Sequence, residues 1–124
     1  MIRPAFALFT ISLAISACDR GPPAAPAGLF ASAQARADGA SLFAANCAIC
    51  HGVRGDGGGQ RREGMNPPPA NLTLPPWSEE ASAGRTFLAV RNGLRGTAMP
   101  PWLSLTDRQV WDIVAFIHSL KSAN

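Results

Sequence analysis

The sequence predicts a small all-α domain built from three to four helices. Three segments carry helix signals, glycine- and proline-rich stretches separate them, and no stretch alternates apolar and polar residues with hairpin signals, as strands would. The chain has 124 residues, which leaves room for one compact domain after an N-terminal export segment and a linker are subtracted. A second domain is therefore not expected.

The first two helices are expected on either side of a long loop region. The first is expected from about Asp38, a candidate N-cap, to Cys47. The second is expected from about Ser82 to Asn92, because apolar residues recur there at helical spacing and Gly93 follows as a stop.

The third helix has the clearest signals. Thr106 and Gln109 form a capping-box pattern, which satisfies backbone N–H groups at a helix start. Five residues after them make one apolar face at helical spacing, namely Val110, Ile113, Val114, Ile117 and Leu120.

Composition indicates a thin hydrophobic core. Hydrophobic residues make up 47% of the chain, but alanine, glycine and proline supply much of the bulk. A large apolar cofactor would fill that deficit. The formal charge is +3, and without Arg3 ten basic residues face eight acidic ones, a balance too even to indicate nucleic-acid binding.

The start of the chain, residues 1–17, is interpreted as a signal sequence. An uncharged run from residue 4 to 17 follows Arg3 and is too short to span a bilayer comfortably. Its end, Ile15-Ser16-Ala17-Cys18, resembles a bacterial lipoprotein box, which implies that Cys18 becomes a lipidated membrane anchor. The alternatives are cleavage near residues 35–37, which would release a soluble periplasmic protein, and an uncleaved helix.

Residues 18–37 are expected to form a flexible alanine- and proline-rich linker. They lack apolar periodicity and contain several helix breakers, so an extended linker would reach on the order of 50 Å. From Leu29 onward the segment is rich enough in alanine to be partly helical. The folded domain is expected to span residues 38–124.

Cys47-Ala48-Ile49-Cys50-His51 is the Cys-x-x-Cys-His attachment signature of c-type haem. Two thiols three residues apart can reach both vinyl groups, and the next residue delivers an imidazole to the iron. A thioredoxin-like pair would need a strand-helix-strand context that the sequence lacks. A zinc site would need two more ligands, and only Cys18 and His118 remain.

Residues 38–121 resemble a class I c-type cytochrome. The matching features occur in the family's order: Gly39 and Phe43, the Cys-x-x-Cys-His-Gly run, the Gly55 and Gly57 turn, the stretch Gly96-Thr97-Ala98-Met99-Pro100, and Trp111 and Phe116. The resemblance implies a small cytochrome c fold around one covalent haem. It also implies that the first and last helices cross at Gly39, with Phe43, Trp111, Phe116 and Leu120 around the crossing.

Met99 is the expected sixth ligand, opposite His51. Pro100 and Pro101 stiffen its loop, and His/Met ligation favours ferrous iron while leaving no open coordination position. Met65 and His118 are the weaker candidates. Met65 follows a flexible glycine- and arginine-rich segment, and a methionine is most often a core residue.

Other residues are expected around the haem. The glycine run at 55–59 is interpreted as a turn, and the resemblance implies that the carbonyl of Pro68 or Pro69 orients the His51 ring. Three large apolar residues are expected to wall the pocket, namely Trp77, Trp102 and Leu103. Three arginines are expected either near the haem carboxylates and exposed edge or on a solvated face, namely Arg85, Arg91 and Arg95.

The sequence thus predicts an electron carrier, not an enzyme, that docks transiently with redox partner proteins and stays tethered to the membrane. A monomer is expected unless the chain belongs to a complex. The first alternative is a haem subunit of a larger dehydrogenase, reductase or oxidase. The second is an enzyme or sensor in which the sixth coordination position of the iron opens, although no distal acid-base residue is evident near Met99.

Overall fold

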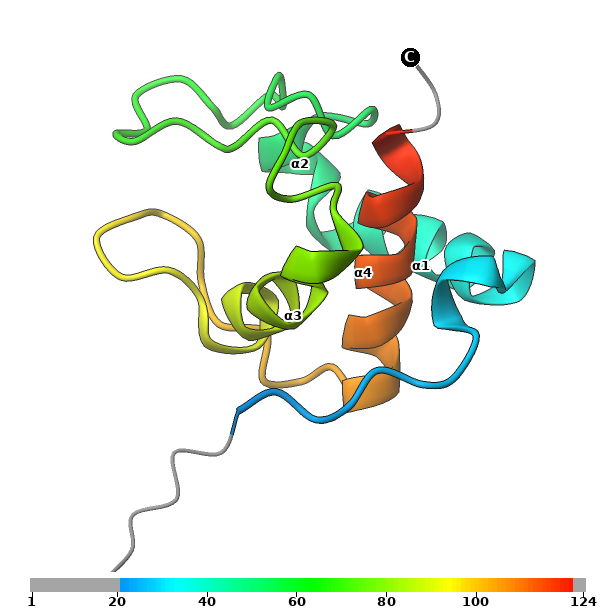
Figure 1. Ribbon diagram of the computed structural model, residues 1–124. Coiled ribbons are helices and arrows are strands. Elements are labelled where there is room, and N and C mark those ends of the chain that lie inside the picture. Colours follow the sequence, from blue (N-terminus) through cyan, green and yellow to red (C-terminus); the bar gives the residue numbers. More distant parts are fainter. Residues whose placement is uncertain (1–20, 122–124) are drawn as a thin grey trace, which may run out of the picture.

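The computed structural model describes residues 21–121, which contain helices and no strands (Figure 1). The elements in chain order are η1 (Leu29–Ala31), α1 (Ala33–Asn46), α2 (Ala48–His51), η2 (Glu80–Ser82), α3 (Ala83–Asn92) and α4 (Asp107–Leu120). The all-α prediction is confirmed. None of these helices is long and apolar enough to cross a bilayer.

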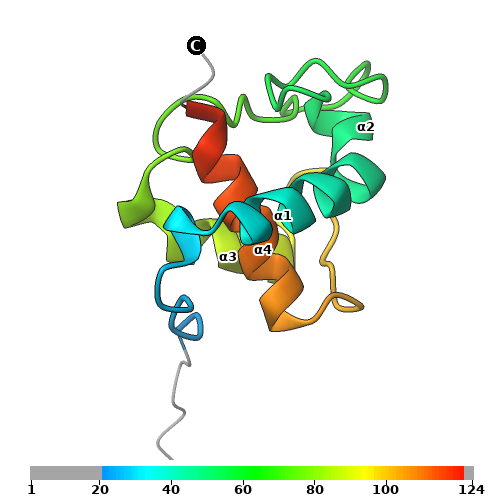
Figure 2. The same cartoon turned by 90° about the vertical axis from the view of Figure 1, so that its right-hand side faces the viewer.

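Helices α1 and α4 cross in direct contact, as Figure 2 shows. At the crossing, a Cβ added to Gly39 would overlap with the carbonyl group of Asp112, so no larger side chain fits there. The rings of Phe43 and Phe116 pack beside the crossing with their centroids 5.1 Å apart. The expected crossing at Gly39 is therefore present.

Two apolar clusters on either side of α4 form the core. The first joins Leu29 and the start of α1 to α3 and α4, and within it the Phe87 and Trp111 rings lie 4.6 Å apart. The second joins Phe43 to Leu72 and to the C-terminal half of α4. The loop between α2 and α3 therefore contributes to the core through Leu72, which is 6% exposed.

The boundaries of α3 and α4 agree with the sequence. Gly93 follows α3 with a φ of +68°, and the Thr106 hydroxyl at the start of α4 accepts a hydrogen bond from the Gln109 N–H. The Gln109 side chain accepts one in return from the Thr106 N–H at 2.9 Å, which completes the capping box.

The expected start of the first helix near Asp38 is wrong. Helix α1 begins at Ala33, because the Ser32 side chain caps it by accepting a hydrogen bond from the Ala35 N–H at 3.1 Å. Leu29 is buried in the core, and the Phe30 ring packs 4.7 Å from the His118 ring. The packed part of the chain thus begins before the expected boundary between residues 37 and 38.

Candidate functional site

The main candidate site is a cavity of about 310 Å³ between α2, the proline-rich loop and the loop after α3. Its size lies at the lower end of the range for small-molecule sites, about 300–1,000 Å³. Its lining is mostly apolar and consists of Asn46, Cys47, Cys50, His51, Met65, Pro67, Pro68, Pro69, Ala70, Trp77, Leu94, Thr97, Ala98, Met99, Pro100 and Trp102. The structure therefore brings the cysteine pair, the histidine and both candidate methionines to one cavity.

The short helix α2 positions the cysteine pair. Cys47 ends α1 by donating its N–H to the Phe43 carbonyl at 2.8 Å, and it also starts α2 by accepting from the His51 N–H at 2.9 Å. One turn of helix thus carries Cys47, Cys50 and His51, and no disulfide joins the two cysteines.

The glycine run forms a turn that lies over the end of α2. The Gly57 and Gly59 N–H groups donate to the carbonyls of His51 and Cys50 at 2.7 and 3.1 Å, which satisfies carbonyls that the helix leaves free. A Cβ added to Gly59 would overlap with the Cys50 backbone. Close approach of two backbones therefore accounts for glycine here.

The His51 ring is oriented by Ala70, so the expectation that Pro68 or Pro69 plays this role is wrong. The His51 Nδ1 atom lies 3.1 Å from the Ala70 carbonyl oxygen. Since a carbonyl can only accept, Nδ1 carries the proton and Nε2 keeps its lone pair. Burial lowers the pKa of His51, against the effect of this hydrogen bond, so the neutral imidazole is favoured. A neutral ring with a free Nε2 can bind a metal ion.

The Cys47 thiol is held in its neutral form. Burial raises its pKa to about 11, and the neighbouring Cys50 adds to this rise. Catalytic and redox-active thiols need a lowered pKa, because the thiolate is the reactive species. The environment of Cys47 thus disfavours a thioredoxin-like pair. Within residues 21–121, no cluster of three or more His, Cys, Asp or Glu residues could hold a metal ion.

The Met99 backbone makes two hydrogen bonds, and the Met65 backbone makes one, from its N–H to the Arg62 carbonyl at 3.1 Å. The Met99 N–H donates to the Thr97 hydroxyl at 3.1 Å, and its carbonyl accepts from the Leu94 N–H at 3.3 Å. Met99 also borders a second, smaller cavity of about 40 Å³ that His51 shares and that Met65 does not reach. The choice of Met99 as ligand stays a prediction, because both sulfur-bearing side chains line the main cavity.

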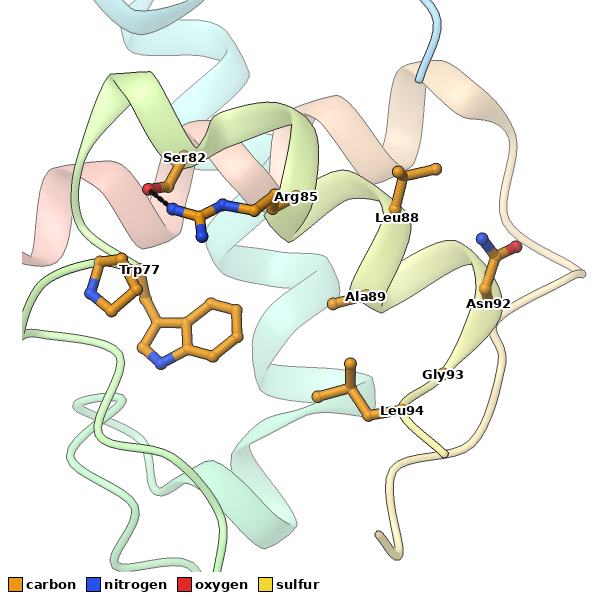
Figure 3. A pocket seen from close by; sticks show the side chains of 9 residues that line it. Trp77, Ser82, Arg85, Leu88, Ala89, Asn92, Gly93 and Leu94 are labelled. Carbon is orange, nitrogen blue, oxygen red and sulfur yellow. Dashed lines mark hydrogen bonds between the residues drawn. The ribbon is translucent and has the colours of Figure 1, made fainter. Parts of the chain in front are cut away.

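The expected aromatic walls are present, and the expected apolar wall at Leu103 is not. Trp77 and Trp102 line the main cavity, whereas Leu103 is 73% exposed and does not line that cavity. Trp77 also separates the main cavity from an adjoining pocket of about 350 Å³ (Figure 3). Leu94 borders both.

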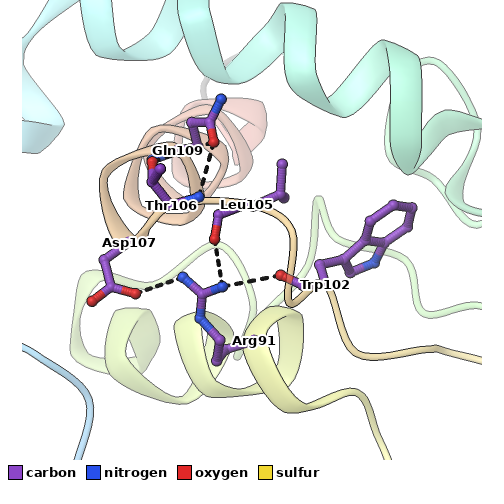
Figure 4. Close-up of polar contacts among 6 residues, drawn as sticks. All are labelled: Arg91, Trp102, Leu105, Thr106, Asp107 and Gln109. Carbon is purple, nitrogen blue, oxygen red and sulfur yellow. Dashed lines mark hydrogen bonds and ion pairs between the residues drawn. The ribbon is translucent and has the colours of Figure 1, made fainter.

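The three candidate arginines have different surroundings. Arg85 lines the adjoining pocket and donates to the Ser82 hydroxyl at 2.9 Å (Figure 3). Arg91 turns away from both pockets and bonds to the segment before α4 (Figure 4). Arg95 is exposed. With a side chain that is only 17% exposed, Arg91 does not lie on a solvated face. The expected place of the three arginines near the haem edge stays a prediction.

The chemistry of the lining fits a haem covalently attached at the Cys-x-x-Cys-His motif. Apolar walls suit a porphyrin, two thiols at one end could form thioethers, and a neutral imidazole with a free Nε2 suits iron. His118, the remaining histidine, lies on α4, packs against Phe30 of η1 and does not line the cavity.

Comparison with known proteins agrees with this fit. The family model for cytochrome c matches residues 36–121. Subunit CcoP of the cbb3-type cytochrome c oxidase of Cereibacter sphaeroides is 35% identical over 88 residues, which are 68% of this chain and 27% of CcoP. The chain thus matches only about a quarter of the length of that curated relative.

Two solved structures share the fold. The reducing HAO-like protein complex of Kuenenia stuttgartiensis contains a chain with a TM-score of 0.63 and 23% identity, over 80% of this chain and 46% of that one. Cytochrome cL of Methylophaga aminisulfidivorans gives a TM-score of 0.54 and 24% identity, over 73% of this chain and 57% of that one. The chain belongs to the cytochrome c family, as a class I c-type cytochrome with covalently bound haem c.

Proposed function

We propose that the chain is a periplasmic, membrane-tethered carrier of single electrons. Cys47 and Cys50 bind its haem through thioethers, and His51 and Met99 are the axial ligands of the iron. The observation that carries this proposal is that one apolar cavity borders both thiols, the His51 imidazole and the Met99 thioether.

The proposed ligands suit electron transfer because they keep both axial positions filled. Bound haem supplies an iron that alternates between the ferrous and ferric states. The Ala70 carbonyl fixes the ring of His51, so that its Nε2 lone pair is available. The Thr97 hydroxyl fixes the backbone of Met99, whose soft sulfur favours ferrous iron. With both positions filled, no site for substrate remains at the metal.

Exogenous ligands test the carrier role. We expect the oxidised holoprotein to be low-spin and to bind cyanide slowly, and the reduced holoprotein to leave carbon monoxide unbound over the time of a redox cycle, because Met99 fills the sixth position. Absorption spectroscopy before and after each addition measures this. A high-spin oxidised form, or carbon monoxide binding within the mixing time, would instead indicate an enzyme or sensor with an open iron site.

A second candidate function is that of a haem subunit in a larger oxidoreductase. The 35% identity to an oxidase subunit favours it, since the same domain serves there as part of a longer chain. Either function relies on contacts with redox partner proteins. Stable co-purification of this chain with a partner from native membranes would favour the subunit, and recovery of the free monomer would favour the carrier.

The proposed anchor, Cys18, lies outside the described residues. Its tether is shorter than the expected linker of residues 18–37, because Pro22 lies beside Gly84 of α3 and Leu29 is buried in the core. Even fully extended, residues 18–22 span at most ~15 Å. A lipid on Cys18 would therefore keep the haem domain close to the membrane surface.

Lipidation is tested by growth with labelled palmitate. We expect label in the wild-type protein and none in Cys18→Ser, because only the thiol can take the lipid. We also expect Cys18→Ser to leave the membrane fraction, since a single-lipid or unlipidated domain binds membranes weakly. Absence of label from both proteins would remove the anchor and leave a soluble periplasmic protein as the alternative, and equal label in both would place the lipid on a residue other than Cys18.

A further inference from the structure

We propose that Arg91 is a positioning residue that holds the Met99 loop on α3 and thereby keeps the Met99 sulfur at the haem iron. The Met99 loop is defined here as residues 93–106, between α3 and α4. This inference rests on the proposed function, in which Met99 is the sixth ligand.

Arg91 binds the C-terminal half of the Met99 loop at two carbonyls and the first residue of α4 at its carboxylate (Figure 4). Its Nη1 donates to the carbonyls of Trp102 and Leu105 at 3.0 and 2.6 Å, and its Nη2 pairs with the Asp107 carboxylate at 2.5 Å. The Arg91 side chain is only 17% exposed, whereas that of Asp107 is 64% exposed. Arg91 is therefore a partly buried cross-link and not a free surface cation.

The residue type fits this task. A guanidinium has five N–H donors in a fixed plane and can serve three acceptors at once, which the rotating ammonium of lysine cannot do with the same geometry. Arg91 also packs on the hydrophobic core. Its guanidinium lies 5.8 Å from the centre of the Phe87 ring, and Phe87 packs on Trp111.

The other end of the loop is fixed by backbone contact. A Cβ added to Gly93 would come within 2.7 Å of the Met99 carbonyl oxygen, and Gly93 has a φ of +68°. The loop therefore folds back tightly on the end of α3 and places Met99 next to Gly93. The chain then leaves the cavity toward α4, and the bond from the Trp102 N–H to the Val90 carbonyl, at 3.1 Å, is the backbone tie to α3 beside Arg91.

Loss of Arg91 removes two bonds to the loop downstream of Met99 and the ion pair with Asp107, where α4 begins. The N-terminal half stays anchored by Gly93, but the C-terminal half gains freedom to move away from α3. Met99 then leaves the iron more often, and an external ligand can take its place. The substitution leaves the Met99 side chain itself unchanged. It therefore shortens the time for which the Met99 sulfur stays bound to the iron.

The experiment measures cyanide binding to the oxidised holoprotein, the sulfur-to-iron absorption band and the reduction potential. We expect cyanide to bind about tenfold faster to Arg91→Gln than to the wild type, because bonds to a charged donor are lost. The potential should fall, and the band should weaken. Asp107→Asn should change these three readouts less than Arg91→Gln does, and Arg91→Lys should have an intermediate effect. Each of the two variants keeps some of the hydrogen bonds that Arg91 makes.

Two control variants distinguish the positioning of Met99 by Arg91 from a general loss of protein stability. Arg108→Gln breaks an ion pair with Asp112 that lies within α4, and it should leave all three readouts unchanged. Leu120→Ala destabilises the buried core at the end of α4 that lies opposite to the loop, because Leu120 is the last residue of that helix and packs in the cluster of Phe43 and Leu72. A Leu120→Ala protein with the same loss of unfolding free energy as Arg91→Gln should still bind cyanide at the wild-type rate.

The inference is overturned if folded Arg91→Gln keeps the wild-type cyanide rate and potential, or if Leu120→Ala accelerates binding equally. If Arg91→Gln does not accumulate, the same measurements are made on Arg91→Lys. A wild-type rate of cyanide binding to Arg91→Lys would then contradict the inference. Failure of the proposed function looks different: the wild type itself would lack the sulfur-to-iron band, and Met99→Ala would leave its spectrum unchanged.

Discussion

The double variant Cys47→Ala, Cys50→Ala is expected to accumulate without covalently bound haem. Thioether attachment needs a sulfur at each position, and the fixed spacing on α2 offers no substitute. The described domain also has a thin core around cavities of about 310 and 350 Å³. Loss of a ligand that binds only the folded state removes its stabilisation, so we expect less folded protein as well.

Haem staining of the denatured protein, together with its helical circular dichroism, measures this result. Ile49→Ala is the matched control, because Ile49 lies between the two cysteines and its side chain is 48% exposed. We expect the control to keep its haem after denaturation. Haem that survives denaturation in the double variant would show that the attachment lies elsewhere in the chain.

Met99→Ala is expected to abolish the sulfur-to-iron band and to lower the reduction potential. Axial ligands set haem potentials over a range of about 0.8 V, so exchange of the thioether for water should lower the potential by on the order of 0.1 V. The open position should also bind carbon monoxide rapidly. Absorption spectra of both redox states and a potentiometric titration measure these changes.

Met65→Ala is the control for this variant, because the Met65 side chain lines the same cavity. We expect it to keep the band and to change the potential only slightly. Loss of the band in Met65→Ala, with retention in Met99→Ala, would reverse the assignment of the ligand. Loss in both would mean that the loops on the two sides of the cavity depend on each other.

Local signals in the sequence predict most of the fold. The capping box at Thr106 and the stop at Gly93 depend on residues three or fewer positions away, and both are present in the structure. The start of α1 was missed because Asp38 and Ser32 are both acceptable caps on local grounds. Tertiary packing decides between them, since Leu29 and Ala35 are buried against α4 and extend the helix toward the N-terminus.

Site residues that lie next to one another in the sequence are predictable. Contacts that only the tertiary fold creates are less so. Cys47, Cys50 and His51 are contiguous, so their grouping is visible in the sequence. The partner of His51 is a backbone carbonyl, and any residue can supply one, so nothing in the sequence distinguishes Ala70 from Pro68 or Pro69. Nor does the sequence show what Arg91 binds, because its three acceptors are two carbonyls and a carboxylate more than ten residues away.

The most direct test of the account is the mass of the peptide that trypsin releases between Arg36 and Arg54 from the mature protein, made with its haem-attachment machinery. This peptide contains Cys47, Cys50 and His51. We predict that it carries the mass of one haem and has no thiol that an alkylating reagent can label. An unmodified peptide with two alkylated cysteines would contradict the account.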